Sequence, residues 1–297
     1  MVCEIFSLSS SSSIEVRSEW CRLLVLFSVA GLFRSRLIAK GVEVGDRVFA
    51  IAAHPDDIEF VMSGTMMLLK DAGCELHYMN IANGCCGSTE HDARTTAKLR
   101  RQEAMRAADH LGAVFHESLT DDLAIFYDKP TLARLGSVVR KVAPSMLLVH
   151  SPQDYMEDHM NACRLAVTAA FARGMPNFCV DPVCPPVEEE VTIYHAQPHG
   201  NCDGLRLPIV PDLYVDVTSK IVQKSEMLAC HQTQKRWLDE SQGMGSYIET
   251  MKTLSQAVGK LSGKFEYAEG WRRHSHLGLC AEDRDPLRYY LQPFATD

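Results

Sequence analysis

Apolar runs of strand length alternate with segments of helical period along the chain from Val48 onward. This alternation is typical of βαβ units, in which parallel strands are joined by crossover helices. The fold class it predicts is α/β, a Rossmann-like, mostly parallel sheet flanked by helices. We predict strands at residues 48–53, 75–81, 113–116 and 146–150, and helices at residues 60–72, 93–111, 131–142 and 159–173.

Residues that commonly end helices follow three of the predicted helices. Gly73 and Gly112 come just after two of the predicted helices, where a left-handed cap is favoured. Pro144 interrupts the third helix before its strand. Right-handed crossovers then bring the loops after the first and fourth strands to one edge of the sheet, the carboxyl edge at which open α/β folds bind ligands. We expect the active site there.

The second half of the chain is less regular. Further strands are predicted at residues 191–196 and 213–217, separated by a loop at 198–211 that is rich in Gly, Pro and Asn. Helices at 219–231 and 235–261 follow, and then a charged, aromatic-rich tail. Because no segment resembles a linker, residues 42–297 are predicted to form a single domain, with residues 1–41 as an N-terminal extension.

The N-terminal extension differs in composition from the rest. Residues 7–13 are serine except for Leu8, and the apolar run at 23–33 is shorter than the roughly 20 residues that span a bilayer. It resembles the core of a signal peptide, but Glu15 and Glu19 precede it where positive charge is expected. We predict no stable membrane span and a cytoplasmic location. Export through an N-terminal signal stays open, as does a disordered extension.

The composition of the chain limits the kinds of molecule it is expected to bind and the state of its cysteines. The 297 residues carry a formal net charge of −8 with both signs interspersed, so a nucleic-acid partner is not expected. The 11 cysteines are scattered through predicted helices and strands, which favours reduced thiols over a disulfide framework. The sequence leaves a homo-oligomer open.

The most informative motif follows the first predicted strand. His54, Asp56 and Asp57 come directly after its apolar residues, and Pro55 stiffens the turn between them. Catalytic zinc commonly takes three protein ligands from His, Asp, Glu and Cys and keeps one position for water. His54 and Asp57 can supply two ligands, and one of the two carboxylates is free to accept a proton. The alternative is a helix N-cap, which aspartates often form.

A third ligand is expected after the fourth strand. There, Asp158 and His159 form a second acid–histidine pair at the start of a predicted helix. His159 is the predicted ligand. Asp158 is better suited to orient a neighbouring imidazole, as carboxylates beside metal-bound histidines commonly do, or to cap the helix.

Together these motifs resemble the LmbE-like (PIG-L) family of zinc-dependent de-N-acetylases. The resemblance rests on residues 53–57 with Glu59, residues 100–103, Asp158–His159 and residues 224–234. It implies one Zn²⁺ per chain, held by His54, Asp57 and His159, with Asp56 as general base. The implied substrate is a small N-acetylated amino sugar of the N-acetylglucosamine type.

One position departs from the family pattern. Members often carry a histidine three residues before the ligand histidine, and here that residue is Met156. A thioether can neither stabilise an oxyanion nor protonate an amine. His231 is the leading catalytic candidate for this role, and the candidates for substrate binding are Arg100, Asp154, Tyr155 and His199.

Two alternatives stay open at this point: hydrolysis of another small-molecule amide, and a non-catalytic metal- or sugar-binding protein. A nucleotide-binding Rossmann protein is disfavoured, because residues 54–57 replace the glycine-rich first turn that it needs.

Overall fold

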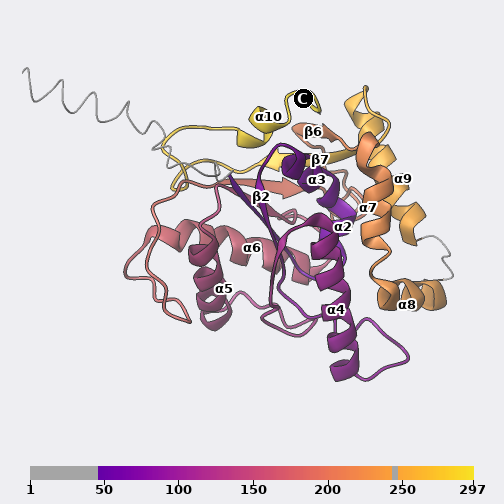
Figure 1. Cartoon of the computed structure of the whole chain (residues 1–297), viewed down its shortest axis with the longest axis horizontal. Coiled ribbons are helices and arrows are strands. Elements are labelled where there is room, and N and C mark those ends of the chain that lie inside the picture. Colours follow the sequence, from indigo (N-terminus) through magenta and orange to yellow (C-terminus); the bar gives the residue numbers. More distant parts are fainter. Residues whose placement is uncertain (1–45, 243–246) are drawn as a thin grey trace, which may run out of the picture. The chain divides into compact units, whose positions relative to one another are not determined.

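The computed structural model describes residues 46–242 and 247–297, and a single mixed β-sheet runs through them (Figure 1). Its strand order is β3-β2-β1-β4-β5-β7-β6-β8. The first five strands in this order pair in parallel, as predicted, and the last three pair antiparallel. The strands are β1 (Arg47–Ala52), β2 (Glu75–Asn80), β3 (Val114–His116), β4 (Met146–Val149), β5 (Thr192–Ala196), β6 (Leu213–Asp216), β7 (Ala268–Arg273) and β8 (Ala295–Thr296).

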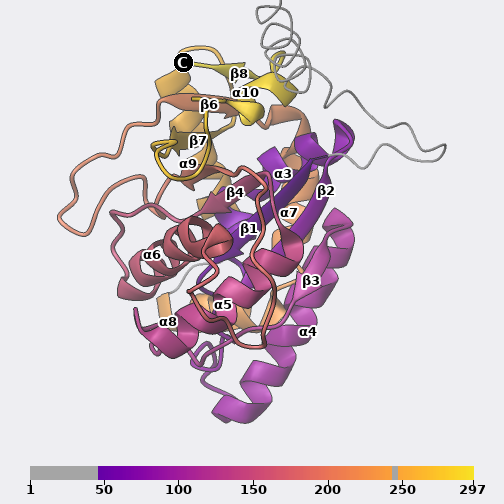
Figure 2. The same cartoon turned by 90° about the vertical axis from the view of Figure 1, so that its left-hand side faces the viewer.

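Helices cover both faces of the parallel strands. Figure 2 shows α5 and α6 in front of the sheet, with α7 and α8 behind it. The α-helices are α2 (Asp57–Val61), α3 (Ser63–Asp71), α4 (Ala93–Leu111), α5 (Lys129–Val142), α6 (Glu157–Phe171), α7 (Ile221–Leu228), α8 (Gln232–Gln242), α9 (Tyr247–Ser262) and α10 (Pro286–Tyr290), and short 3₁₀ turns lie at Ala172–Gly174 and Thr218–Lys220. None of the helices in these described ranges is long and apolar enough to cross a membrane.

The pleat of β1 divides the hydrophobic core in two. Val48 and Ala50 pack in a cluster with residues of α3, α4 and α7, whereas Phe49 and Ile51 pack in a second cluster with α5 and α6. Successive side chains of a strand point to opposite faces, so a strand buried on both faces is continuously apolar. This explains why the first predicted strand is an unbroken apolar run.

One predicted helix is divided in two, and another begins earlier than predicted. The helix predicted at 60–72 begins earlier, at Asp57, and is interrupted at Met62. A second helix starts there because the carboxylate of Glu269 accepts hydrogen bonds from the backbone N–H groups of Gly64 and Thr65, at 2.9 and 2.7 Å. The helix predicted at 235–261 is α8 and α9, and α8 begins at Gln232.

The C-terminal tail contains a strand that the sequence pattern does not predict. β7 lies between β5 and β6 although it includes Glu269, Arg272 and Arg273. Its charges are accommodated by partners, since the buried Glu269 pairs with the buried Lys224. The expectations for the N-terminal extension fall outside the described residues.

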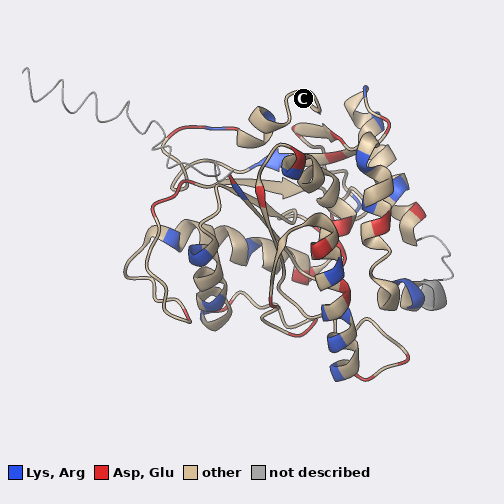
Figure 3. Ribbon diagram, in the orientation of Figure 1, with Lys and Arg blue, Asp and Glu red and all other residues tan. Residues whose placement is uncertain are grey.

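Charged side chains of both signs are spread over the described elements. In Figure 3, basic residues recur along α4, with acidic residues on α4 itself and on neighbouring elements. One of these basic residues, Arg101, forms an ion pair with Glu117.

The topology places two loops side by side. β1 and β4 are adjacent and parallel, with Ile51 opposite Val149. The chain leaves both strands at the same edge of the sheet, so the segments beginning at Ala53 and His150 start as neighbours.

Candidate metal centre and active site

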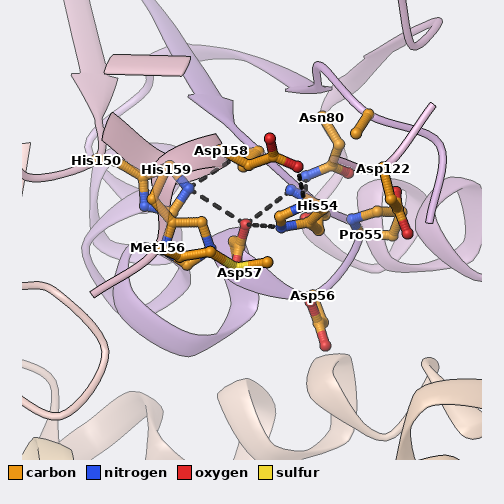
Figure 4. A network of polar contacts seen from close by, with 12 residues as sticks. His54, Pro55, Asp56, Asp57, Asn80, Asp122, His150, Met156, Asp158 and His159 are labelled. Carbon is orange, nitrogen blue, oxygen red and sulfur yellow. Dashed lines mark hydrogen bonds and ion pairs between the residues drawn. The ribbon is translucent and has the colours of Figure 1, made fainter. Parts of the chain in front are cut away.

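The turn after β1 separates two adjacent carboxylates. Asp56 has a φ of 109°, in the left-handed region that is unusual for a residue other than glycine. Such a conformation costs free energy and is found mostly where a site requires it. Figure 4 shows the consequence: Asp57 faces His54 and His159, while Asp56 points away toward the helices of the C-terminal half.

His54 is oriented by a carboxylate from the other loop. Its Nε2 lies 2.9 Å from Oδ2 of Asp158, which also accepts a hydrogen bond from the backbone N–H of Leu123 at 2.7 Å. Because the acceptor is a carboxylate, Nε2 carries the proton and Nδ1 is the free nitrogen. That Nδ1 is 3.5 Å from Oδ2 of Asp57.

His159 is oriented in the same way. Its Nδ1 lies 3.0 Å from Oδ1 of Asp154, which leaves Nε2 free, 3.4 Å from Oδ1 of Asp57. Its ring also stacks on that of His150, with centroids 4.2 Å apart and planes 8° from parallel. His150 Nε2 in turn is 3.2 Å from Oδ2 of Asp57.

These side chains fit a metal ion. One ligand atom from each of His54, Asp57 and His159 lies within 4.8 Å of the others, and His150, Asp154 and His159 form an overlapping group. In metal sites, histidine ligands usually donate their other ring N–H to a carboxylate, as both histidines of the first group do here. Two imidazoles and a carboxylate are a donor set that zinc accepts, so the structure brings together the three predicted ligands in suitable chemistry.

Mutual attraction within this group shifts its pKa values. Burial lowers the pKa of His54, but hydrogen bonds to Asp158 and Asp57 outweigh it and raise the pKa to about 9. Burial likewise lowers the pKa of His159, yet Asp57 and Asp154 raise it to about 10. Burial would raise the pKa of Asp57, but His159 and His150 hold it well below its usual range. Asp57 is thus ionised, and binding of a metal ion to this group would release protons from the imidazoles.

Asp56 occupies a separate, nearly buried position. It is 8% exposed, accepts a hydrogen bond from the Tyr247 hydroxyl and has Oδ1 3.6 Å from Nη2 of Arg100. Burial raises the pKa of Asp56, and the positive charge of Arg100 opposes that rise. A carboxylate of raised pKa beside a metal site suits a general base.

Arg100 and Tyr247 therefore act on Asp56. Arg100 is 2% exposed and also donates hydrogen bonds to the carbonyl of Pro55 and to Gln234. It was predicted as a substrate-binding candidate, and here its guanidinium faces the carboxylate of the site. Tyr247 was not predicted, because it lies in α9 outside every motif and only tertiary packing brings it to Asp56.

His231, the predicted catalytic histidine, is buried against Glu59 and interacts electrostatically with Asp56. Its side chain has no exposed surface, and its Nε2 is 3.1 Å from Oε1 of Glu59. Glu59 is also fully buried and accepts a hydrogen bond from the Tyr78 hydroxyl at 3.0 Å. His231, Glu59 and Tyr78 thus form a buried polar group.

Tyr155 and His199, two of the predicted substrate-binding residues, lie beside the metal ligands. The Tyr155 ring centroid is 5.5 Å from that of His159 and 5.9 Å from that of His199. Tyr155 is 56% exposed, so its side chain reaches solvent beside His159. Asp154, by contrast, is buried and holds His159.

A further group of possible ligands within the described residues comprises Cys85, Cys86 and Asp122. Both carboxylate oxygens of Asp122 accept backbone N–H groups, from Gly84 at 2.7 Å and Cys86 at 2.9 Å. These hydrogen bonds hold the loop together, and they explain why the three side chains lie close to one another.

Comparison with known proteins places this site in a family. Residues 49–171 match the family model of PIG-L, the GlcNAc-PI de-N-acetylases. The chain is 32% identical over 193 residues to 4-oxalmesaconate hydratase of Pseudomonas putida, covering 61% of this chain and 70% of that protein. It is 26% identical over 233 residues to diacetylchitobiose deacetylase of Thermococcus kodakarensis, covering 76% of this chain and 82% of that protein.

A solved structure shares the fold. The N,N′-diacetylchitobiose deacetylase of Pyrococcus horikoshii superposes with a TM-score of 0.66 at 22% identity, over 93% of this chain and 100% of that chain. The chain belongs to the PIG-L (LmbE-like) family, as its motifs predicted. The protein is accordingly an enzyme of this deacetylase family.

Proposed function

We propose that this protein is a zinc-dependent hydrolase that removes the acetyl group from a small N-acetylated amino sugar. The observation that carries the proposal is the pairing of each ligand imidazole with a carboxylate. His54 with Asp158, and His159 with Asp154, leave two ring nitrogens directed at Asp57. The deacetylases among its relatives support the choice of reaction.

In this proposal His54, Asp57 and His159 hold the metal. When bound, zinc supplies Lewis-acid chemistry, activating water and polarising the amide carbonyl. Asp56 accepts the proton of the attacking water and returns it to the departing amine, so that the amide and water become acetate and a free amino sugar. Tyr247 and Arg100 hold the Asp56 carboxylate in place for both transfers.

The experiment begins with metal analysis of the purified protein, followed by a screen for primary-amine release from N-acetylglucosamine conjugates. We expect about one zinc per chain and stoichiometric acetate. Asp56→Asn should keep the metal and lose about 10²–10⁴-fold in kcat, the usual contribution of general acid–base catalysis. Asp57→Asn is the matched comparison, since it should lose the metal as well. An Asp56→Asn variant with undiminished turnover would exclude this mechanism.

Hydration of an unsaturated carboxylate is the second candidate function. It is favoured by the 32% identity to 4-oxalmesaconate hydratase and by Met156, which stands where the deacetylase pattern has a histidine. Both reactions use an activated water and a base, so the same metal site serves either. Loss of the ultraviolet absorbance of 4-oxalmesaconate on incubation, with no amine released from any acetamido sugar, would select the hydratase.

A further inference from the structure

The proposed hydrolysis needs a hydrogen-bond donor that Met156 cannot supply. The anionic tetrahedral intermediate of amide hydrolysis needs a hydrogen-bond donor besides the metal. Met156 lies at the N-terminus of α6, among the side chains drawn in Figure 4, and its thioether has no proton to donate. Another side chain at the site must supply the donor.

His199 is held near the site by a tight turn. The backbone N–H of Asn201 donates to the carbonyl of Pro198 at 2.9 Å, and Gly200 has the positive φ of 83° that the third position of a type II turn requires. The Asn201 side chain ties this turn to α9 through a 3.2 Å hydrogen bond to the carbonyl of Leu254. The imidazole at the corner of the turn is thus presented from a fixed backbone.

Aromatic contacts link this imidazole to the His159 ring through Tyr155. The ring of His199 packs edge-on against Phe60, with centroids 5.0 Å apart. It also makes a tilted contact with Tyr155, which itself contacts His159. His199 also interacts electrostatically with Asp57, Asp154 and His159. Neither of its ring nitrogens has a hydrogen-bond partner within the part of the chain that the structure describes.

The other predicted candidates are less suitable. His231 has no exposed surface and lies against Glu59. Asp154 is an acceptor whose Oδ1 is already used by His159 and by the backbone N–H of Met156. A carboxylate would also repel an oxyanion.

We propose that His199 donates the hydrogen bond that stabilises the oxyanion, the role that Met156 cannot fill. This inference rests on the proposed hydrolysis. Burial lowers the pKa of His199, so near neutral pH the ring is uncharged and offers one N–H. A neutral, preorganised donor at the position of developing charge is the usual form of an oxyanion site.

The first test uses methylphosphonate, whose tetrahedral phosphorus resembles the reacting carbon. Its dissociation constant for the zinc-loaded protein, measured by titration calorimetry, should rise at least about 10-fold in His199→Ala, as expected for loss of a hydrogen bond to a charged group. His199→Gln, which keeps an N–H donor, should stay within about threefold of wild type by the same reasoning. Zinc content should be unchanged, because His199 is not a ligand.

His110→Ala is the matched control, since His110 is exposed at the C-terminal end of α4 and pairs, at 3.9 Å, with Glu226, whose side chain is also exposed. Unchanged methylphosphonate affinity in His199→Ala would overturn the proposal. A larger loss of methylphosphonate affinity in Tyr155→Phe than in His199→Ala would also overturn it, because the hydroxyl of Tyr155 would then be the donor.

The second test is rescue. With a substrate that the wild type hydrolyses, His199→Ala should lower kcat by about 10²–10³-fold with little change in KM, as removal of one oxyanion donor does. Adding Met156→His to this variant should recover activity, because it restores an imidazole three residues before His159. Full activity in His199→Ala contradicts the role of His199. If the wild type releases no amine while the methylphosphonate effect persists, the reaction is wrong and the anion-binding role of His199 stands.

Discussion

At the scale of single residues, the site depends on two adjacent aspartates that face different environments. The left-handed backbone of Asp56 turns its carboxylate toward Tyr247 and Arg100, while Asp57 joins the two histidines. Neighbouring carboxylates with different partners acquire different pKa values, and in the proposed mechanism this separation divides the acid–base and metal-binding roles.

A residue-scale prediction concerns Asp158, which orients His54. Asp158→Asn keeps the shape of the side chain but removes its charge, so zinc affinity should fall about 10–100-fold, the usual effect of losing a carboxylate behind a histidine ligand. Competition with a chromophoric chelator measures this affinity. Glu157→Gln is the control, because Glu157 is exposed on the preceding position of the same helix. Equal affinities for the two variants would show that Asp158 does not support the ligand.

At the scale of secondary-structure elements, a buried ion pair connects α7, β7 and α3. Lys224 donates to the carbonyl of Phe60 at 2.8 Å and to Glu269, and Glu269 accepts the first free N–H groups of α3. Both charged side chains are buried, and each polar group has a partner. This network fixes the break between α2 and α3, and α2 carries Asp57.

The element-scale prediction follows from removing one partner of this pair. Lys224→Met leaves the Glu269 carboxylate buried without its cation, which should lower the free energy of unfolding by about 3–5 kcal/mol. Lys220→Met is the comparison, since Lys220 pairs at 2.6 Å with Asp71, which is 62% exposed. Exposed pairs contribute less than about 1 kcal/mol. Urea denaturation measures the free energy of unfolding of both variants. A similar decrease in Lys224→Met and Lys220→Met would contradict the argument.

At the scale of the whole molecule, the sheet joins a parallel half and an antiparallel half at β5 and β7. His195 lies at this junction, 6% exposed, with Nδ1 3.0 Å from the carbonyl of His150 and Nε2 2.9 Å from Nδ1 of His274. The carbonyl requires the proton on Nδ1, so Nε2 accepts from His274. This arrangement favours the neutral ring.

A pH dependence of stability follows for the whole molecule. Burial is the main cause that lowers the pKa of His195 to about 4, against an ordinary value of 6.5. As pH falls below 6.5, the unfolded chain binds a proton that the folded protein does not, so the free energy of unfolding decreases until pH reaches about 4. This shift in pKa corresponds to a decrease in the free energy of unfolding of at most about 3 kcal/mol.

Urea denaturation between pH 7.5 and pH 4 compares the wild type with His195→Gln. Gln cannot titrate, so the difference in stability between the two proteins should change in favour of the variant as pH falls. A pH-independent difference would show that His195 does not cause the effect.

The sequence by itself determined the parallel part of the fold and which residues gather in the candidate metal centre. Apolar runs buried on both faces mark β1 and β4, whereas β2 and β5 mix apolar and polar residues, and the histidine–aspartate motifs lie where β1 and β4 end. These features depend on local periodicity and on adjacent residues, which a single sequence displays. The family resemblance rests on the same short motifs.

Only the tertiary structure decided which distant side chains complete the site. Tyr247 reaches Asp56 across 191 positions, and His54 meets Asp158 across 104. The polar strand β7 joins the sheet because Lys224 neutralises Glu269, a pairing that no local pattern contains. Such contacts are set by the packing of elements far apart along the chain, and periodicity carries no record of them.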